Sequence, residues 1–273
     1  MPGGKHVRDV FADIQVGLAD VTYSSICKIG DRETNEDSVL ALCRGGDCCF
    51  VVADGLSAHG GGDVASRILV DTFGRLFNDD RSDNRTFLAG AFDGAQAEIL
   101  SSRHDYTHMK TTGVALSIRD GRFSWGHIGD SRLYFFRVAK FLRGEKSLRG
   151  VKLCERTMDH SVPQMLVMAG EISEDDMRRH PDRAKLLRAL GDDRDEPQYA
   201  LSKERRLSRG DAFLLCTDGF WEHIPKDSMI ATLRNTAGRG GDAGDWLDEM
   251  LAIVETAGAD YDMDNYSAIT VVV

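Results

Sequence analysis

The chain has 273 residues, of which 42% are apolar, so it can bury a sizeable core in one large domain or two small ones. Its formal net charge of −10 makes nucleic acid an unfavourable partner. No stretch approaches the roughly 18 consecutive apolar residues of a membrane span, and the N-terminus lacks the apolar segment of a signal peptide. We therefore expect a cytoplasmic protein that binds neither nucleic acid nor a membrane.

The first part of the chain predicts strands followed by a pair of helices. Residues 1–20 are ambiguous between a loose leader and an edge strand, and residues 30–37 are expected to form a polar loop. Strands are expected at 23–28, 39–42 and 48–53, the last two joined by a hairpin turn at 44–47. Apolar residues at helical spacing predict helices at 63–77 and 85–102, which we expect to pack together over one sheet face.

The middle of the chain predicts strands with short connections, which indicate antiparallel neighbours. These strands are expected at 113–118, 122–129 and 132–138. The basic stretch 140–149 is expected to be a solvated hairpin loop. Residues 158–195 are polar and form an excursion from the sheets, with short helices predicted at 163–169, 175–180 and 183–190.

The last part of the chain predicts a buried strand, two helices and a terminal strand. Their expected positions are 212–217, 226–234, 246–257 and 267–273, with the glycine-rich stretch 238–244 between the helices. The chain shows no internal repeat and no interdomain linker. Antiparallel groups of strands and paired helices predict two sheets flanked by helices in one domain.

The cysteines show no C-x-x-C pair and no zinc-ligand spacing. Several lie in apolar runs, which is typical of buried thiols in a reducing compartment. We therefore expect reduced thiols at the six positions, which are Cys27, Cys43, Cys48, Cys49, Cys154 and Cys216.

Aspartates recur where predicted apolar strands begin or end. Four of them stand beside glycine, asparagine or serine, and these are Asp54, Asp130, Asp218 and Asp264. Asp37 precedes a strand in the same manner. Asp-Gly is also a common turn dipeptide, so each could be a simple turn. If the sheets pack face to face, these carboxylates can meet in an all-oxygen site for two hard cations about 3.5–4 Å apart, as in two-metal hydrolases.

Short motifs follow one another along the chain. They are Arg32 with Asn35-Glu36-Asp37-Ser38; Val52-Ala53-Asp54-Gly55 followed by His59-Gly60-Gly61; Thr111-Thr112-Gly113; His127-Ile128-Gly129-Asp130-Ser131-Arg132; Asp159-His160-Ser161; Cys216-Thr217-Asp218-Gly219; and Asp264-Asn265. With these motifs in this order, the chain resembles the metal-dependent serine/threonine protein phosphatases of the PPM type, the type-2C phosphatases, in their compact bacterial form. The resemblance covers nearly the whole chain, from about Arg32 to the C-terminus.

The resemblance implies an α+β fold. This is a four-layer α-β-β-α sandwich in which two mainly antiparallel sheets are flanked by helix pairs, forming a single domain over residues 1–273 with 158–195 as a flap. It implies a protein serine/threonine phosphatase that acts on phosphorylated proteins, opposes a serine/threonine kinase and is a monomer. Metal-activated water would attack the phosphomonoester directly, without a covalent enzyme intermediate.

The resemblance also implies roles for individual residues. Asp54 would bridge two cations and Gly55 would offer its carbonyl, while Asp218 and Asp264 would ligate one cation. Asp37 would act near the metals, Glu36 through water, and Asp130 would bind a weaker third metal. The implied cofactors are Mn²⁺ or Mg²⁺, two or three per chain. Arg32 would hold the substrate phosphate, since a guanidinium can grip two phosphate oxygens at once; without the neighbouring motifs, a surface ion pair of Arg32 with Glu33 or Glu36 would be the simpler reading.

The chain departs from the family pattern in its loops. Leu56 stands where many eukaryotic relatives have a histidine that acts as a general acid, and we expect His59, three residues later, to brace the glycine turn instead. Ser57-Ala58 replaces the usual Gly-Gly, and Lys110 replaces a glycine before the Thr-Thr pair. These changes affect loop shape and leave the metal ligands in place.

Other readings are weaker. Cys27 and Arg32 have only four residues between them, one fewer than a cysteine-nucleophile phosphatase loop needs. An aspartyl-phosphate enzyme needs D-x-D-x-[TV] after an early strand, whereas Asp262-Met263-Asp264 lies near the C-terminus and is not followed by the Thr or Val. A catalytically silent relative that binds phosphoproteins as a regulatory module stays open, although all five aspartates are present. A calcium-binding structural protein is disfavoured because the EF-hand pattern is absent.

Overall fold

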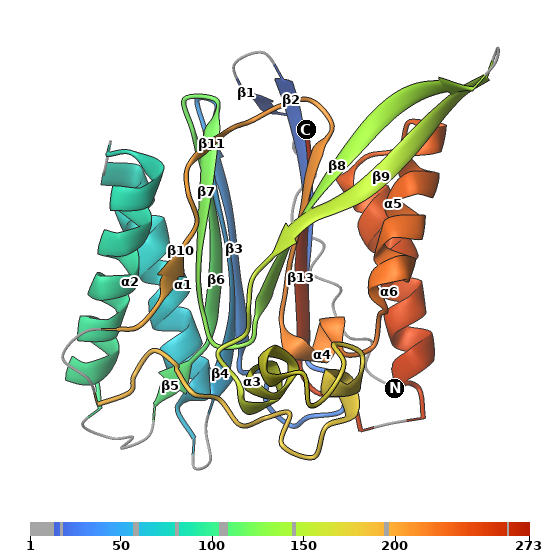
Figure 1. The fold of residues 1–273 in the computed structure, drawn as a ribbon. Coiled ribbons are helices and arrows are strands. Elements are labelled where there is room, and N and C mark those ends of the chain that lie inside the picture. The colour runs from blue at the N-terminus through green and yellow to red at the C-terminus, as the bar shows by residue number, and fades with distance from the viewer. Residues whose placement is uncertain are drawn as a thin grey trace, which may run out of the picture.

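The computed structural model describes residues 14–16, 19–56, 60–79, 82–103, 109–143, 146–193, 197–260 and 262–273. Two antiparallel sheets pack face to face, and a pair of helices covers the outer face of each sheet (Figure 1). This arrangement confirms the predicted α+β class and the four-layer α-β-β-α sandwich.

The first sheet has the strand order β10-β7-β6-β4-β3, with β11 pairing with β7 and β5 with β4. Its strands are β3 (Asp37–Arg44), β4 (Asp47–Leu56), β5 (Lys110–Thr111), β6 (Gly113–Arg119), β7 (Arg122–Ile128), β10 (Ala200–Leu201) and β11 (Arg205–Arg206). The predicted hairpin is confirmed, because β3 and β4 are joined at Gly45 and Gly46, both with positive φ. Glycine adopts this conformation without a steric penalty.

The second sheet has the strand order β1-β2-β13-β12-β8-β9. Its strands are β1 (Ile14–Val16), β2 (Ala19–Lys28), β8 (Arg132–Arg143), β9 (Lys146–Arg156), β12 (Asp211–Cys216) and β13 (Tyr266–Val272). The terminal strand β13 lies between β2 and β12, so the chain ends inside the sheet and joins its first and last thirds.

Helices cover both sheets. α1 (Gly62–Asp79) and α2 (Asn84–Ser101) pack on the first sheet, and α5 (Lys226–Arg239) and α6 (Ala243–Gly258) pack on the second. The shorter α3 (Val162–Ala169), η1 (Asp176–Arg179) and α4 (Asp218–Trp221) lie at one end of the sandwich (Figure 1). Asp83 caps α2 by accepting hydrogen bonds from the backbone N–H groups of Arg85 and Thr86, which satisfies donors that the first turn leaves free.

Three buried clusters form the core, one between each pair of layers. Strand β4 shows why its sequence is an unbroken apolar run. Cys49, Val51 and Ala53 face the cluster under α1 and α2, whereas Phe50 and Val52 face the cluster between the sheets. A strand that is buried on both faces loses the usual alternation of apolar and polar residues.

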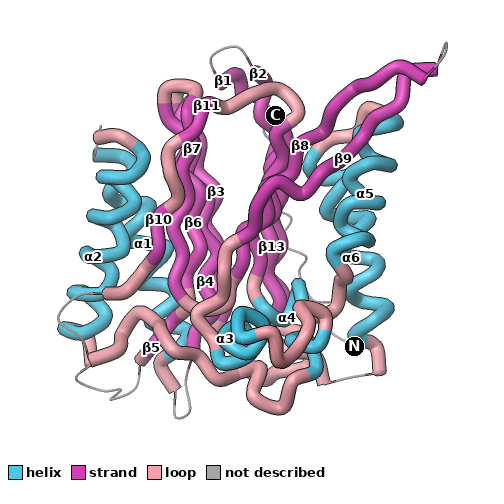
Figure 2. The backbone as a smooth tube through the Cα atoms, viewed as in Figure 1, coloured by secondary structure: helices cyan, strands magenta, loops and turns pink. Residues whose placement is uncertain are grey.

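Two predictions of local structure are wrong, and two further elements differ from the prediction in helix type or in length. The stretch 140–149 is not a loop, since β8 and β9 remain paired from Val138–Val151 to Arg143–Lys146 and extend beyond the rest of the sheet (Figure 2). Residues 183–190 are not a helix, because their backbone groups bond to distant segments instead. Val162 donates to Lys185, and Leu187 donates to His160. The predicted helix 175–180 is a single 3-10 turn, and α5 runs through Gly238 into the predicted linker.

The expected reduced state of the cysteines is wrong for one pair. Cys43 and Cys48 form a disulfide across the β3–β4 hairpin, where they lie directly opposite with their Cα atoms 4.1 Å apart. Strand register, which no cysteine motif reveals, brings them together. Cys49 and Cys216 are buried free thiols, as expected. No helix in the described part of the chain is long and apolar enough to cross a membrane.

Candidate metal and phosphate site

The five predicted aspartates come to the same end of the sandwich. Asp37 and Asp54 lie directly opposite each other in the register of β3 and β4. Asp130 lies in the turn between β7 and β8, Asp218 opens α4 directly after β12, and Asp264 precedes β13. The first two come from one sheet and the last two from segments next to the other. The face-to-face packing of the sheets therefore brings distant parts of the chain together.

The electrostatics of Asp54 show how closely these groups are placed. Burial raises the pKa of Asp54 well above its usual range, and the charges of Asp218, Asp37, Asp130 and Asp264 raise it further. All four neighbours act on one carboxyl, so all five groups lie within electrostatic reach of one another at Asp54. Like charges that share a buried site disfavour each other's ionisation.

The other buried members show the same effect. Burial raises the pKa of Asp37 to about 8, opposed by the hydroxyls of Ser267 and Thr217 and supported by the charge of Asp218. Burial followed by the charge of Asp218 raises the pKa of Asp130, and burial followed by the charge of Asp264 raises that of Asp218. Burial and repulsion between the carboxylates therefore outweigh the opposing charges of Arg132 on Asp130 and of Arg183 on Asp218.

This set of side chains fits a hard divalent cation. Asp37 Oδ2 accepts a hydrogen bond from Thr217 Oγ1 at 3.0 Å, but Asp37 Oδ1 is buried without a hydrogen-bond partner of good geometry. Buried carboxylates are normally paired or bound to a metal, and oxygen donors suit Mg²⁺ or Mn²⁺. Within the described residues, no three Asp, Glu, His or Cys side chains are already close enough to ligate one ion.

Arg32 lies at the edge of this cluster and is bound to one of its members. Its Nε and Nη2 donate to Asp264 Oδ1 and Oδ2, both at 2.9 Å. Sequence reasoning assigned Arg32 to the substrate phosphate and Asp264 to a cation, and considered Glu33 or Glu36 as structural partners of Arg32. The observed pair instead joins two residues of the predicted site.

Asn265 holds the loop that carries Arg32, a role that sequence reasoning missed. Its Nδ2 donates to the carbonyls of Ile29 at 2.7 Å and Thr34 at 3.0 Å. Its Oδ1 accepts from the backbone N–H of Glu36 at 2.8 Å. Three hydrogen bonds from one buried amide therefore fix the loop on both sides of Arg32. The available signal was the position of Asn265 directly after Asp264.

The backbone around Asp54 is held by the Thr-Thr pair. The Asp54 carbonyl accepts from Thr111 Oγ1 and from the backbone N–H of Thr112, both at 2.9 Å, and its N–H donates to Thr112 Oγ1 at 3.2 Å. Gly55 next to it has no room for a side chain, because a Cβ atom would collide with the carbonyl oxygens of Gly62 and Glu36. Gly55 also donates its N–H to the Glu36 carbonyl at 3.1 Å.

A buried ion pair supports the turn that carries Asp130. Arg132 donates to both oxygens of Asp159, at 2.9 and 2.6 Å, and both side chains are at most 2% exposed. The Arg132 guanidinium stacks on Trp221, whose Nε1–H donates to the Asp130 carbonyl at 3.0 Å. Arg132 and Asp159 therefore support the turn that carries Asp130 through Trp221. None of these hydrogen bonds reaches another aspartate of the cluster.

Lys110 is one of the departures from the family pattern, and the structure describes it. Lys110 binds Asp192 at 2.6 Å and thereby links β5 to the end of the 158–193 segment, a contact that glycine could not make. His59, Ser57 and Ala58 lie outside the described residues.

Comparison with known proteins tests the resemblance. A family model described as protein phosphatase 2C matches residues 28–254. The chain belongs to the protein phosphatase 2C family. The matched region contains four of the five aspartates, and Asp264 lies beyond it.

Individual family members agree with this assignment. The serine/threonine protein phosphatase PstP of Mycobacterium tuberculosis is 31% identical over 209 residues, which are 74% of this chain and 37% of that protein. The chain thus spans well under half of that relative's length. A crystal structure of the same M. tuberculosis phosphatase has a TM-score of 0.73 at 26% identity and covers 93% of this chain and 98% of that chain.

A second solved structure contains metal ions. It is the catalytic domain of PstP in complex with two manganese ions, with a TM-score of 0.71 at 24% identity, covering 92% of this chain and 97% of that chain. At 24% identity, this similarity shows that the present chain has the same fold as that domain.

Proposed function

We propose that this chain is a metal-dependent protein serine/threonine phosphatase that hydrolyses phosphomonoesters. The observation that carries the proposal is the cluster of four aspartates around Asp54, all of which raise its pKa. Uncompensated carboxylates at one end of a phosphatase 2C fold are suited to hold divalent cations. The manganese ions in the PstP structure support the same choice of cofactor.

The chain's own residues would hold these ions and the substrate. Asp54, Asp218 and Asp264, with the Gly55 carbonyl, would hold two Mn²⁺ or Mg²⁺ ions, Asp37 and Glu36 would act beside them, and Asp130 would hold a third. When bound, such ions supply the positive charge that phosphate transfer needs and lower the pKa of water. The carboxylates would orient these ions. Thr111 and Thr112 keep the Asp54 backbone in place.

Arg32 would bind the phosphate of the substrate through its two donor nitrogens. In the structure these nitrogens bind Asp264, and both side chains are about half exposed. If Asp264 held a cation instead, the two nitrogens of Arg32 would be free to bind a phosphate. The two halves of the ion pair would thus exchange partners together.

Direct attack by water, without a covalent enzyme intermediate, agrees with the state of the thiols. Burial raises the pKa of Cys49 to about 12 and also raises that of Cys216. Burial likewise raises the pKa of Cys27. A thiol with a raised pKa is protonated near neutral pH and is a weak nucleophile.

We further propose that the substrate is a protein phosphorylated on serine or threonine, that the enzyme opposes a serine/threonine kinase, and that it acts as a cytoplasmic monomer. Residues 1–273 would form one domain with 158–195 as its flap. The alternative of a silent phosphoprotein-binding module is less well supported, because every aspartate of the site is present and they surround one carboxyl.

The test is hydrolysis of p-nitrophenyl phosphate and of a phosphothreonine peptide with added Mn²⁺ or Mg²⁺. We expect turnover of both substrates with metal and loss of turnover with excess chelator, reversed by fresh metal. Full activity in chelator would reject the metal-dependent mechanism. Binding of the phosphopeptide without any turnover in metal would favour the silent module.

A further inference from the structure

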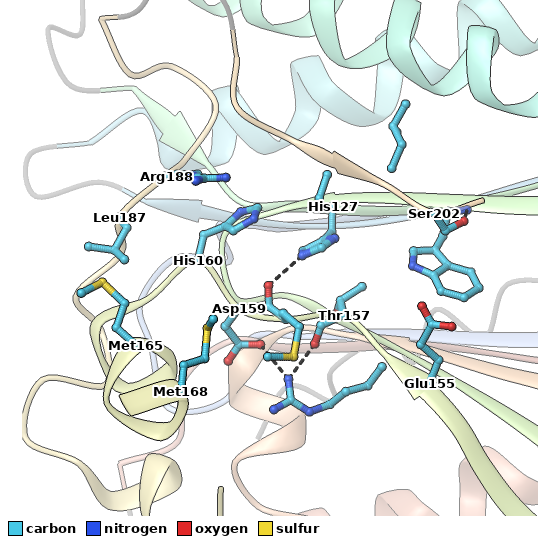
Figure 3. A pocket seen from close by; sticks show the side chains of 15 residues that line it. His127, Glu155, Thr157, Asp159, His160, Met165, Met168, Leu187, Arg188 and Ser202 are labelled. Atoms are coloured by element: carbon cyan, nitrogen blue, oxygen red, sulfur yellow. Dashed lines mark hydrogen bonds and ion pairs between the residues drawn. The ribbon is translucent and has the colours of Figure 1, made fainter. Parts of the chain in front are cut away.

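A pocket of about 450 Å³ lies beside the segment that the sequence marked as an excursion (Figure 3). Its walls come from β7, from the end of β9 and the residues after it, from α3, from residues 187–188 and from β10 with the residue after it. The lining includes His127, His160, Met165, Met168, Leu187 and Arg188. Its volume falls within the roughly 300–1,000 Å³ of ligand-binding pockets, so it can hold one or two large side chains.

One end of the pocket is apolar and open. Met158, Met165, Met168 and Leu187 all line it, and they are 47%, 56%, 73% and 38% exposed. Figure 3 shows Met165, Met168 and Leu187 gathered at that end, with Glu155 and Ser202 at the other. Among the side chains whose exposure the structure describes, which exclude residues 1–20 and 140–149, Ile29 is the one other large apolar side chain that is this exposed. Clustered exposed apolar groups mark binding surfaces, and methionine adapts to varied partners.

The charge left uncompensated at the pocket is positive. Glu155 is paired with Arg205, and Arg156 with Asp159 and Glu174. Arg188 has no carboxylate partner among the described residues and donates at 3.5 Å to the Gln198 carbonyl. Next to the apolar end, Arg188 therefore favours a ligand that carries a negative charge beside an apolar group.

The wall of the pocket is hydrogen-bonded to the turn that carries Asp130. His160 in its wall donates its backbone N–H to the Gly129 carbonyl at 2.8 Å, and Gly129 N–H donates to His160 Nδ1 at 3.2 Å. Gly129 immediately precedes Asp130. A peptide whose phosphorylated residue lay over the aspartates would therefore pass beside this wall.

We propose that this pocket binds a large apolar side chain, flanked by an acidic residue, of the phosphoprotein substrate. The apolar side chain would pack on Met165, Met168 and Leu187, and the acidic residue would meet Arg188. The proposal rests on the proposed phosphatase function and adds the class of substrate sequence that the enzyme prefers.

The test is a scan of phosphothreonine peptides in which tryptophan, followed by glutamate, is moved along an otherwise glycine- and serine-based sequence. Hydrolysis is measured with saturating Mn²⁺. At one position relative to phosphothreonine we expect tryptophan to lower KM about tenfold, the effect of one well-packed interface residue. Met168→Asp and Leu187→Asp should each abolish this gain, and Arg188→Gln should abolish the part due to glutamate.

Three controls separate the pocket from the catalytic centre. Met168→Leu keeps an apolar side chain and should retain the gain, and Ser101→Asp adds the same charge on the exposed end of α2 and should have no effect. p-Nitrophenyl phosphate does not reach the pocket, so its kinetics should be the same in all variants. A flat scan, or an unchanged gain in Met168→Asp and Leu187→Asp, would overturn the proposal.

Binding measured without turnover keeps the two proposals apart. Fluorescence anisotropy of a labelled tryptophan peptide should show about tenfold weaker binding to Met168→Asp than to the wild type and to Met168→Leu. Equal binding to all three would overturn the pocket assignment even if the enzyme is active. Absence of p-nitrophenyl phosphate hydrolysis would instead reject the phosphatase function, while the anisotropy result still decides the pocket.

Discussion

Arg32 and Asp264 form a two-point ion pair in which both donor–acceptor distances are 2.9 Å. Their side chains are 47% and 49% exposed, and exposed ion pairs contribute only about 0–1 kcal/mol. Such a pair can be replaced easily by stronger partners, a phosphate for Arg32 and a cation for Asp264. Its weakness is therefore consistent with a position that must change during turnover.

Arg32→Lys should raise KM for p-nitrophenyl phosphate about tenfold, because lysine cannot bind two phosphate oxygens in a fixed plane. Arg75→Lys is the matched control, since Arg75 forms a similarly exposed pair with Glu98 on the helices. Steady-state kinetics in saturating Mn²⁺ measure the difference. An equal KM in the two variants would show that Arg32 does not hold the phosphate.

Asn265→Ala should raise KM by about tenfold or more, because the loop that carries Arg32 loses three hydrogen bonds. Asn84→Ala is the control, since Asn84 is equally buried and donates to the Arg122 carbonyl and Glu204, away from the five aspartates. Both variants should lose about 1–3 kcal/mol of stability, the cost of unsatisfied buried partners. Only Asn265→Ala should alter KM. An equal KM in the two variants would show that Asn265 supports the fold and does not position Arg32.

Asp218→Asn should abolish turnover and yet raise the melting temperature of the metal-free protein near neutral pH. The reason is that it removes one of the charges that repel Asp54 and Asp37. It should also reduce the rise in melting temperature that Mn²⁺ produces. Asp227→Asn, at an exposed position in the first turn of α5, is the control and should leave turnover and the Mn²⁺-induced rise unchanged. Turnover within a few-fold of the wild type would contradict the assignment.

The stacked rings of His127 and His160 should make the protein sensitive to acid. Burial, followed by the charges of His127 and Arg188, lowers the pKa of His160 to about 3, and burial lowers that of His127. An unfolded histidine titrates near about 6.5. Between these values the unfolded chain binds more protons than the folded chain, so stability rises with pH and is lost on acidification.

His160→Asn tests this behaviour, because asparagine retains an acceptor for the Gly129 N–H and does not titrate. Melting temperatures are compared at about pH 7.5 and about pH 5.5. The wild type should lose more stability on acidification than the variant. Equal losses would mean that His160 is not held neutral by its surroundings.

The sequence was sufficient for the fold, because apolar runs and helical spacing mark its elements along the chain, whereas the convergence of the aspartates was expected only on the condition that the sheets pack face to face. Apolar runs located the strands, and Asp54, Asp130, Asp218 and Asp264 stood at their ends. The errors fall where distant pairing overrides local pattern. Cross-strand bonds extend β8 and β9 through a basic stretch, and the backbone of 183–190 bonds to other segments. The partners of Asn265 were equally invisible, because Ile29 and Glu36 lie more than two hundred positions away.

The disulfide and the Asp37–Asp54 pair lie at opposite ends of the β3–β4 hairpin. Cys43 is paired with Cys48, and six residues back along the same ladder Asp37 is paired with Asp54. A slip of one residue between β3 and β4 would turn every side chain of the strand to the other face. The covalent cross-link forbids such a slip about 20 Å from the carboxylates, a distance set by the rise of about 3.3 Å per residue. The chemistry of one end of the molecule is thus kept in alignment by a bond at the other.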